Sequence, residues 1–291
     1  MEARPGRIVR LALVQSRSAL GTETFDPRDD NLERALIAID AAADDRAQLI
    51  VFGEIYLQGY GTEEWLHLWA TTVSPADRHV RALCDIARKR NVHVVLGAVT
   101  YEADRGDIYN SAILIGPDGV IGTYRKCHLA SMFRGGRVSS ERSFYSPGTD
   151  LPVFDTALGR LGVNICYDAT FPEVSRVQAL KGAELIINVT ASADGRQEAH
   201  RHLHFVRATE NACWYAVCSV VGQQREHKLY GGSRIVDPNG NFVAEAKSNV
   251  EDMVIADVDL DLTVRTRAAI HTFGMRKPEL YRAISDPTPH R

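Results

Sequence analysis

Residues 161–173 read Leu-Gly-Val-Asn-Ile-Cys-Tyr-Asp-Ala-Thr-Phe-Pro-Glu, and this segment combines a strand, a turn and the start of a helix. The apolar run that ends at Cys166 is short and nearly continuous, which indicates a strand buried on both faces of a sheet. Pro172 is typical of the first position of a helix, because its ring sets a helical φ and its missing N–H is not needed there. We therefore predict a strand over Arg160–Cys166 and a helix over Pro172–Lys181.

The same alternation of short apolar runs and helical patterns extends over most of the chain. Further strands are predicted at Arg7–Val14, Gln48–Phe52, Val92–Val99, Ile108–Ile115, Val120–Tyr124, Leu185–Val189 and Trp214–Val220. Further helices are predicted at Asp30–Ala43, with Leu32, Ala35, Leu36 and Ile39 on one face, at Pro75–Arg90, with Ser74 as N-cap, and at Gln197–Asn211. Hairpin turns are expected at Gly116-Pro117-Asp118-Gly119 and Asp237-Pro238-Asn239-Gly240.

Both halves of the chain contain strand–helix–strand units, and each half ends in a hairpin. This order indicates a weak internal duplication, in which two α/β halves pack their sheets face to face within one domain over residues 1–291. The tail from about residue 264 lacks clear periodicity. We expect it to reach across a partner subunit.

Composition excludes several classes of protein. The net charge of -3 and the sequence pI of about 6.4 leave no basic surface for nucleic acid or an anionic membrane. No apolar run approaches the roughly 20 residues that span a bilayer, and the first apolar stretch is too short for a signal peptide. The five cysteines (Cys84, Cys127, Cys166, Cys213 and Cys218) show neither a disulfide pattern nor a paired metal motif. We expect a cytoplasmic protein with reduced thiols.

Four polar residues occupy positions where chemistry is expected. Cys166 ends a buried strand just before a helix, where open α/β sheets bind ligands and where backbone N–H groups lower a thiol pKa. Glu54 follows the apolar strand Leu49–Phe52 in the same way. Lys126 follows the second strand of a hairpin, and Glu141 lies in a loop before Pro147-Gly148. Taken singly, each has a structural alternative: a buried structural cysteine, a capping glutamate, a solvated edge lysine and a solvated loop carboxylate.

Together these segments resemble the nitrilase, or carbon–nitrogen hydrolase, superfamily. The stretches that carry the resemblance are LIVFGEIYLQGY, GTYRKCHL and LGVNICYDATFPE, supported by Pro147-Gly148 and by Arg207-Ala208-Thr209-Glu210-Asn211, in the family's order from about Val9 to Asp259. The resemblance implies a four-layer αββα sandwich, with subunits pairing into a homodimer or a higher homo-oligomer. It also implies that Cys166 is the nucleophile, Glu54 the general base, Lys126 the oxyanion-stabilising cation and Glu141 the second active-site glutamate.

The chemistry of these residue types is consistent with that assignment. An amide carbon is a poor electrophile, so hydrolysis gains from passing through a thioester. The thiol needs a base and a nearby positive charge, which Glu54 and Lys126 supply. The ammonium of Lys126 and the backbone N–H of Tyr167 are the candidate oxyanion donors, each of a kind worth roughly 3–4 kcal/mol. No metal and no cofactor is required.

Other residues allow competing interpretations. His200 and His204 lie four residues apart on the predicted late helix and are a candidate metal pair, although a solvated helix face or a subunit contact is the plainer interpretation. A papain-like pairing of Cys166 with a histidine has no local signature. The candidate substrate-binding residues are Tyr60, Arg134, Arg137, Asn188 and Ala191, with Trp65 as a further aromatic candidate for the pocket wall.

Residues after the cysteine bear on the branch of the superfamily. Nitrile-cleaving members typically have Trp-Glu there, whereas this chain has Tyr167-Asp168 followed by Phe171-Pro172-Glu173, which resembles amidases. N-carbamoyl-D-amino acid hydrolases and some ω-amidases carry arginine where this chain has Ala169 and Thr170. We predict an amidase that converts a small carboxamide into a carboxylate and ammonia. The alternatives are an N-carbamoyl hydrolase, a nitrilase, or a non-catalytic binding module on the same fold.

Overall fold

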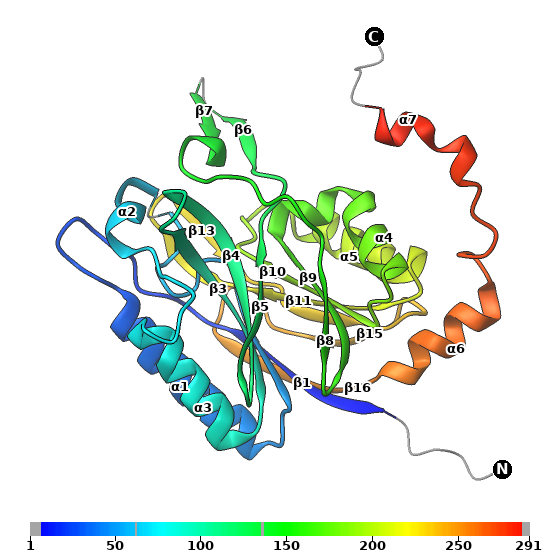
Figure 1. Cartoon of the computed structure of the whole chain (residues 1–291), viewed down its shortest axis with the longest axis horizontal. Coiled ribbons are helices and arrows are strands. Elements are labelled where there is room, and N and C mark those ends of the chain that lie inside the picture. Colours follow the sequence, from blue (N-terminus) through cyan, green and yellow to red (C-terminus); the bar gives the residue numbers. More distant parts are fainter. Residues whose placement is uncertain (1–6, 62, 135–136, 287–291) are drawn as a thin grey trace.

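The computed structural model describes residues 7–61, 63–134 and 137–286. Within them, two six-stranded sheets stack between two pairs of helices, α1 with α3 and α4 with α5 (Figure 1). The first sheet contains β1 (Ile8–Gln15), β2 (Leu49–Phe52), β3 (His93–Glu102), β4 (Asp107–Gly116), β5 (Gly119–Arg125) and β16 (Asp252–Asp259). The second contains β8 (Val153–Thr156), β9 (Gly159–Ile165), β10 (Leu185–Thr190), β11 (Trp214–Ser219), β14 (Arg234–Val236) and β15 (Phe242–Glu245). The predicted four-layer αββα sandwich is confirmed.

The helices alternate with these strands, as the sequence predicted. The main ones are α1 (Arg28–Asp44), α3 (Arg78–Arg90), α4 (Pro172–Leu180), α5 (Gln197–Glu210) and α6 (Leu260–Ile270). Shorter elements are η1 (Glu63–Trp65), α2 (Leu66–Trp69), β6 (Ser131–Arg134), β7 (Arg137–Ser140), η2 (Glu141–Ser143), η3 (Cys166–Thr170), β12 (Val221–Gln224), β13 (His227–Tyr230), η4 (Pro278–Leu280) and α7 (Arg282–Ser285). No helix in the described ranges is long and apolar enough to cross a membrane.

The two sheets share one topology. β1, β2 and β3 pair in parallel, and β4 and β5 continue the sheet antiparallel; β9, β10, β11, β14 and β15 repeat this pattern in the second sheet. Each sheet adds one antiparallel strand beside its first strand, β16 next to β1 and β8 next to β9. The predicted internal duplication is therefore present in the strand order. That the whole of residues 1–291 forms one domain stays a prediction.

The central core lies between the sheets because the strands alternate their side chains. In β2, Leu49 and Val51 join the cluster between the sheets, whereas Ile50 and Phe52 pack under α1 and α3. In β10, Ile187 faces the same central cluster, whereas Ile186 packs under α4 and α5. Period-two alternation with both faces buried explains why these strands read as continuous apolar runs.

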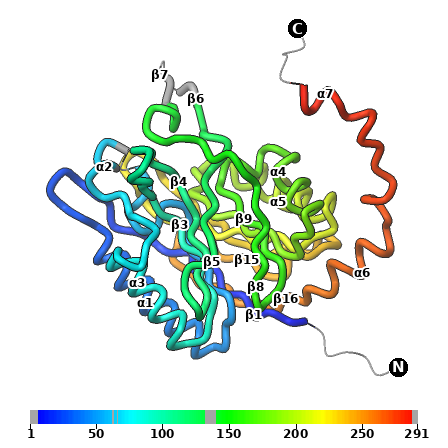
Figure 2. The backbone as a smooth tube through the Cα atoms, in the orientation of Figure 1, coloured from blue at the N-terminus to red at the C-terminus, as the bar shows by residue number. Residues whose placement is uncertain are grey.

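Two predictions about element ends were wrong. Helix α3 begins at Arg78, and its N-cap is Asp77, whose carboxylate accepts from the N–H groups of His79 and Val80; Ser74 lies outside the helix. A carboxylate is as good an N-cap as a serine, and it satisfies two N–H groups here. The chain beyond Thr263 also contains the second half of helix α6, with Thr266 buried against the body. After α6 the chain runs along the outside of the molecule (Figure 2).

The carboxyl ends of the inner strands of the two sheets lie next to each other, and this brings the segments that carry the site residues together. Thr190, at the end of β10, accepts hydrogen bonds from the backbone N–H of Glu54 at 3.3 Å and of Val220 at 3.0 Å. Gly53 precedes Glu54, and a Cβ at this position would lie 2.5 Å from the backbone nitrogen of Val220. Glycine is required there because the backbones approach too closely for any side chain.

Candidate active site

Two strands end in sharp turns beside the site. Cys166 follows β9 directly, and its φ is +46°. Ile55, the residue after Glu54, has a φ of +49°. This left-handed conformation is rare for residues other than glycine and strained for a β-branched one, and such strain concentrates at functional sites. Packing around both turns must therefore hold Cys166 and Glu54 in place.

Lys126 joins the two glutamates in one buried cluster. Its ammonium lies 2.8 Å from Glu54 Oε1 and 2.9 Å from Glu141 Oε1. The side chains of Lys126 and Glu54 are 1% and 0% exposed. Burying one ammonium between two carboxylates leaves a net negative charge if all three are ionised. Charges so thoroughly removed from water persist only when paired and hydrogen-bonded, as they are here.

Hydrogen bonds from backbone groups and from one side-chain amide hold the members of this cluster in position. Asn110, in β4, donates from Nδ2 to Glu54 Oε1 at 2.8 Å, and its carbonyl accepts from the Lys126 N–H at 2.9 Å. Gly148 donates its N–H to the Lys126 carbonyl at 2.8 Å. The second carboxylate oxygen of Glu54, Oε2, is buried and has no partner in the described part of the chain. That oxygen is free to accept a proton.

The cluster changes the acidity of its members. Burial alone would lower the pKa of Lys126, but the charges of Glu54 and Glu141 outweigh it and hold that pKa well above its usual value. Burial, then the charge of Glu54, raises the pKa of the Cys166 thiol to about 12, against a smaller opposing effect of Lys126. The prediction of a lowered thiol pKa is therefore wrong. The positive field of Lys126 is already neutralised by two carboxylates, so little of it remains for the thiol.

A buried carboxylate that sequence reasoning missed ties the lysine segment to the cysteine turn. Asp168 Oδ2 accepts from the Tyr124 hydroxyl at 2.7 Å and the Ile165 N–H at 3.1 Å. Asp168 Oδ1 lies 2.9 Å from the His128 backbone nitrogen and 2.8 Å from its Nδ1. Tyr124 and His128 flank Lys126, and Ile165 precedes Cys166. One fully buried group thus links both sides of the site. Its place in the Cys-Tyr-Asp motif was the only signal in the sequence.

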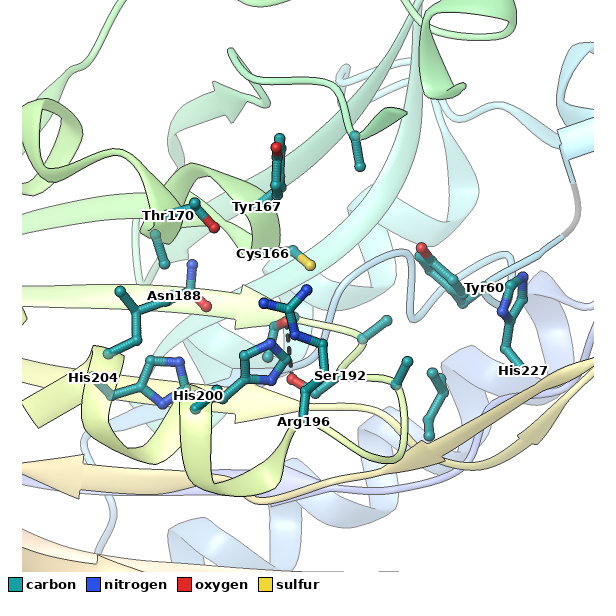
Figure 3. Close-up of a pocket in the computed structure, with 18 of the residues that line it drawn as sticks. Tyr60, Cys166, Tyr167, Thr170, Asn188, Ser192, Arg196, His200, His204 and His227 are labelled. Atoms are coloured by element: carbon teal, nitrogen blue, oxygen red, sulfur yellow. Dashed lines mark hydrogen bonds between the residues drawn. The ribbon is translucent and has the colours of Figure 1, made fainter. Parts of the chain in front are cut away.

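The cluster opens onto a cavity of about 440 Å³. The side chains of Lys126, Glu141 and Cys166 line it, together with Tyr167 and the candidates Tyr60, Asn188 and Ala191 (Figure 3). Glu54 lies beneath it, bonded to Lys126. Ala169 and Thr170 line it as well, whereas Trp65 is not among the described lining residues. The side chains of Arg134 and Arg137 fall outside the described part of the structure, so that candidate pair stays a prediction.

The late-helix histidines do not form a solvated face. His204 is 4% exposed, and both His200 and His204 line the pocket, while His202 remains exposed. The interpretation as a solvated face was therefore wrong for the buried His204 and the half-buried His200, because α5 lies over the second sheet with these side chains turned inward (Figure 3). No group of three or more potential metal ligands occurs among the residues that the structure describes.

Solved structures share this architecture. Nit3 of Saccharomyces cerevisiae, described as a member of branch 10 of the nitrilase superfamily, matches with a TM-score of 0.81 and 28% identity, over 93% of this chain and 96% of that chain. A mutant amidase from Nesterenkonia sp. AN1, with acrylamide added at its active-site cysteine, matches with a TM-score of 0.74 and 25% identity, over 92% and 100% of the two chains. The protein is thus a nitrilase-superfamily enzyme.

The family follows from the sequence comparison. The carbon–nitrogen hydrolase model matches residues 10–268, and the chain belongs to that family. A nitrilase of Pyrococcus abyssi is 33% identical over 89% of this chain and 93% of its own length. Omega-amidase NIT2 of Bos taurus is 30% identical over 94% of this chain and 96% of its own length.

Proposed function

We propose that this carbon–nitrogen hydrolase is a thiol-dependent amidase, which converts a small carboxamide into a carboxylate and ammonia. The observation that carries the proposal is the buried ammonium of Lys126, held between Glu54 and Glu141 in the pocket that Cys166 lines. A nucleophile and a cation at one pocket, with a base bonded to the cation, are the groups that acyl transfer needs.

The raised pKa of Cys166 supports Glu54 as the base of the first step. At neutral pH the thiol is protonated. Because Glu54 Oε2 has no partner, it accepts the thiol proton as the sulfur attacks the amide carbon. The developing oxyanion is stabilised by the Lys126 ammonium and by the backbone N–H of Tyr167.

The remaining steps reuse the same proton carrier. Glu54 returns its proton to the departing nitrogen, which leaves as ammonia, and a thioester remains on Cys166. Glu54 then takes a proton from water, whose oxygen attacks the thioester carbon. The C–S bond breaks, the carboxylic acid leaves, and Glu54 returns the proton to the sulfur to restore the thiol. Glu141 accepts from Lys126 and from the N–H of Ala130, so it orients the ammonium throughout.

Support for an amide over other substrates comes from relatives and from the cysteine segment. Curated relatives include both omega-amidases and nitrilases, and the Nesterenkonia amidase carries acrylamide on its cysteine. Tyr167-Asp168 after the nucleophile favours the amide. An N-carbamoyl substrate, which also releases carbon dioxide, is the second candidate. We further propose a homo-oligomer and a cytoplasmic location.

The test is ammonia release from matched pairs of amides, nitriles and N-carbamoyl compounds. We expect ammonia from amides, none from the corresponding nitriles, and little from the carbamoyl compounds. Glu54→Gln should lower turnover of the best amide by a factor of at least about 100. An enzyme that cleaves nitriles as fast as amides would reverse the assignment. A protein that releases no ammonia, yet binds amides, would be a binding module.

A further inference from the structure

Arg207 of helix α5 contacts the turn that carries the nucleophile. Its Nε donates to the carbonyl oxygen of Ala169 at 2.8 Å, and its Nη2 donates to that of Thr170 at 3.2 Å. Both carbonyls lie at the end of η3, the short turn that begins with Cys166. The end of a helical turn leaves carbonyl groups without partners in the turn itself, and a guanidinium makes strong bonds to such acceptors.

Arg207 is buried, and its neighbours fix its position. Its side chain is 6% exposed, and its Nη1 donates to Glu210 Oε1 at 2.7 Å. Each of the three guanidinium nitrogens thus has an acceptor. The backbone carbonyl of Arg207 accepts from Asn211 Nδ2 at 2.9 Å. Because a buried cation persists only when it is paired and hydrogen-bonded, these bonds leave the guanidinium one position.

The guanidinium lies behind the turn and does not face the substrate. Ala169 and Thr170 line the pocket, whereas Arg207 is not among the lining residues in the described part of the chain. The proton transfers proposed above do not use it. Arg207 therefore influences the reaction through the turn, without touching the substrate.

The turn needs support because the backbone of Cys166 is strained. Its φ is +46°, and such a conformation persists only where the surrounding structure fixes it. Before the cysteine, Asp168 accepts from the N–H of Ile165 at 3.1 Å. After it, Arg207 bonds the last two carbonyls of the turn. The strained residue is thus held by hydrogen bonds on both sides.

We propose that Arg207 is a positioning residue of the reaction. By bonding the end of η3, its guanidinium holds the Cys166 sulfur and the Tyr167 N–H in the geometry that attack on the amide carbon requires. Glu210 orients the guanidinium from the other side. This inference rests on the proposed amidase function, since it assigns a further residue to the same reaction.

The first test separates turnover from binding. Arg207→Lys keeps the positive charge but lacks the planar set of N–H donors. Because a small misplacement of the reacting groups is costly, kcat for the best amide should fall by about 10–100-fold, whereas KM should change by less than about threefold. Arg207→Gln, which also removes the charge, should lose more of kcat. Glu210→Gln disturbs the fold less, leaves both carbonyl bonds possible and should lower kcat by roughly three- to tenfold.

A matched control lies on the same helix. Arg201 pairs with Glu245 outside the pocket, so Arg201→Lys should keep the wild-type kcat. A loss of stability with unchanged kcat in the Arg207 and Glu210 variants would limit both residues to the fold and overturn the inference. A raised KM with unchanged kcat would also overturn it, because that pattern indicates lost substrate binding.

Alkylation of the thiol tests the inference without turnover. Iodoacetamide reacts with the Cys166 sulfur, and mass spectrometry gives the rate at each cysteine. Arg207→Lys should slow the reaction at Cys166 by about tenfold. The partly exposed Cys84, on helix α3, should react at its wild-type rate and is the internal reference. If no amide releases ammonia, the proposed function fails, but this comparison still tests Arg207. An equal rate at Cys166 in the wild type and the variant would reject the positioning role.

Discussion

The two halves of this molecule share a strand order but contribute different kinds of groups to the site. The half built on β1–β5 supplies Glu54 and Lys126, which are charged, buried and bonded to each other. The half built on β9–β15 supplies Cys166 and the α5 side of the pocket, where the buried Nδ1 of His204 has no partner in the described part of the chain. In the first half the charged groups are paired with each other, whereas the second half leaves polar groups facing the cavity.

The two halves have the same strand order, yet their polar groups are expected to contribute differently to stability and to activity. Removing one member of a buried charge pair leaves the other charge uncompensated, so such a change should damage both stability and turnover. Unpaired polar groups in a pocket contribute to binding a ligand, so removing them should affect activity more than stability. Variants in each half therefore probe the comparison directly.

The largest effect is expected at Cys166. Cys166→Ala should reduce ammonia release by a factor of at least about 10⁴, because the thioester route is lost. Its Tm should stay close to that of the wild type, since the thiol is neutral and takes no part in the ion-pair cluster. Mass spectrometry should detect an acyl adduct on the wild-type enzyme after a rapid acid quench and none on the variant. A marked fall in Tm would contradict the division between the halves.

Lys126→Met should harm both properties. Two carboxylates would remain buried without their cation, which typically costs about 3–5 kcal/mol of unfolding free energy. Turnover should fall by roughly 10²–10³, as when an oxyanion donor is removed. Urea denaturation and ammonia release measure the two effects. The control is Lys181→Met, which breaks an exposed pair with Asp150 and should change stability by about 0–1 kcal/mol.

Asp168→Asn tests whether one carboxylate fixes the position of the two halves relative to each other. The amide cannot accept from all four donors, so about 1–3 kcal/mol of stability should be lost. Because Lys126 and Cys166 would shift relative to each other, kcat should fall by about 10–100-fold, with less change in KM. Asp150→Asn, at an exposed carboxylate, serves as control. A stability loss with unchanged kcat would limit Asp168 to a structural role.

The smallest effect concerns pH and the pocket imidazole His200. Burial lowers its pKa to about 4, whereas an unfolded imidazole titrates near about 6.5. The neutral ring therefore contributes stability that is fully present above about pH 6.5 and is lost as the pH falls toward 4. His200→Gln should show a smaller fall in Tm between pH 7 and pH 4.5 than the wild type. The exposed His202→Gln should behave as the wild type, and identical curves for all three would refute this linkage.

Much of the fold and part of the site could be predicted from local pattern. Apolar runs of strand length and amphipathic helices depend on adjacent residues, and the strand boundaries agree to within a few residues. Glu54 and Cys166 could be identified because each directly follows a predicted strand, which is also a feature of adjacent residues. Asn110 and Asp168 were not predicted as site residues. Their hydrogen-bond partners lie far away in the chain, and the neighbouring residues do not indicate which groups they are. Asp77 was missed as a cap because two capping residues lie three positions apart.

By itself the sequence determined the two-sheet architecture, the family and the four candidate positions Cys166, Glu54, Lys126 and Glu141, because each depends on residue type and spacing along the chain. Only the tertiary structure decided the acidity of Cys166, the free oxygen of Glu54 and the polar wall on α5. Those properties depend on burial and on charges from residues far apart in the chain: Lys126 and Glu54 are separated by 72 positions, yet their atoms lie 2.8 Å apart. Electrostatic fields and desolvation act through space, which a linear pattern does not record.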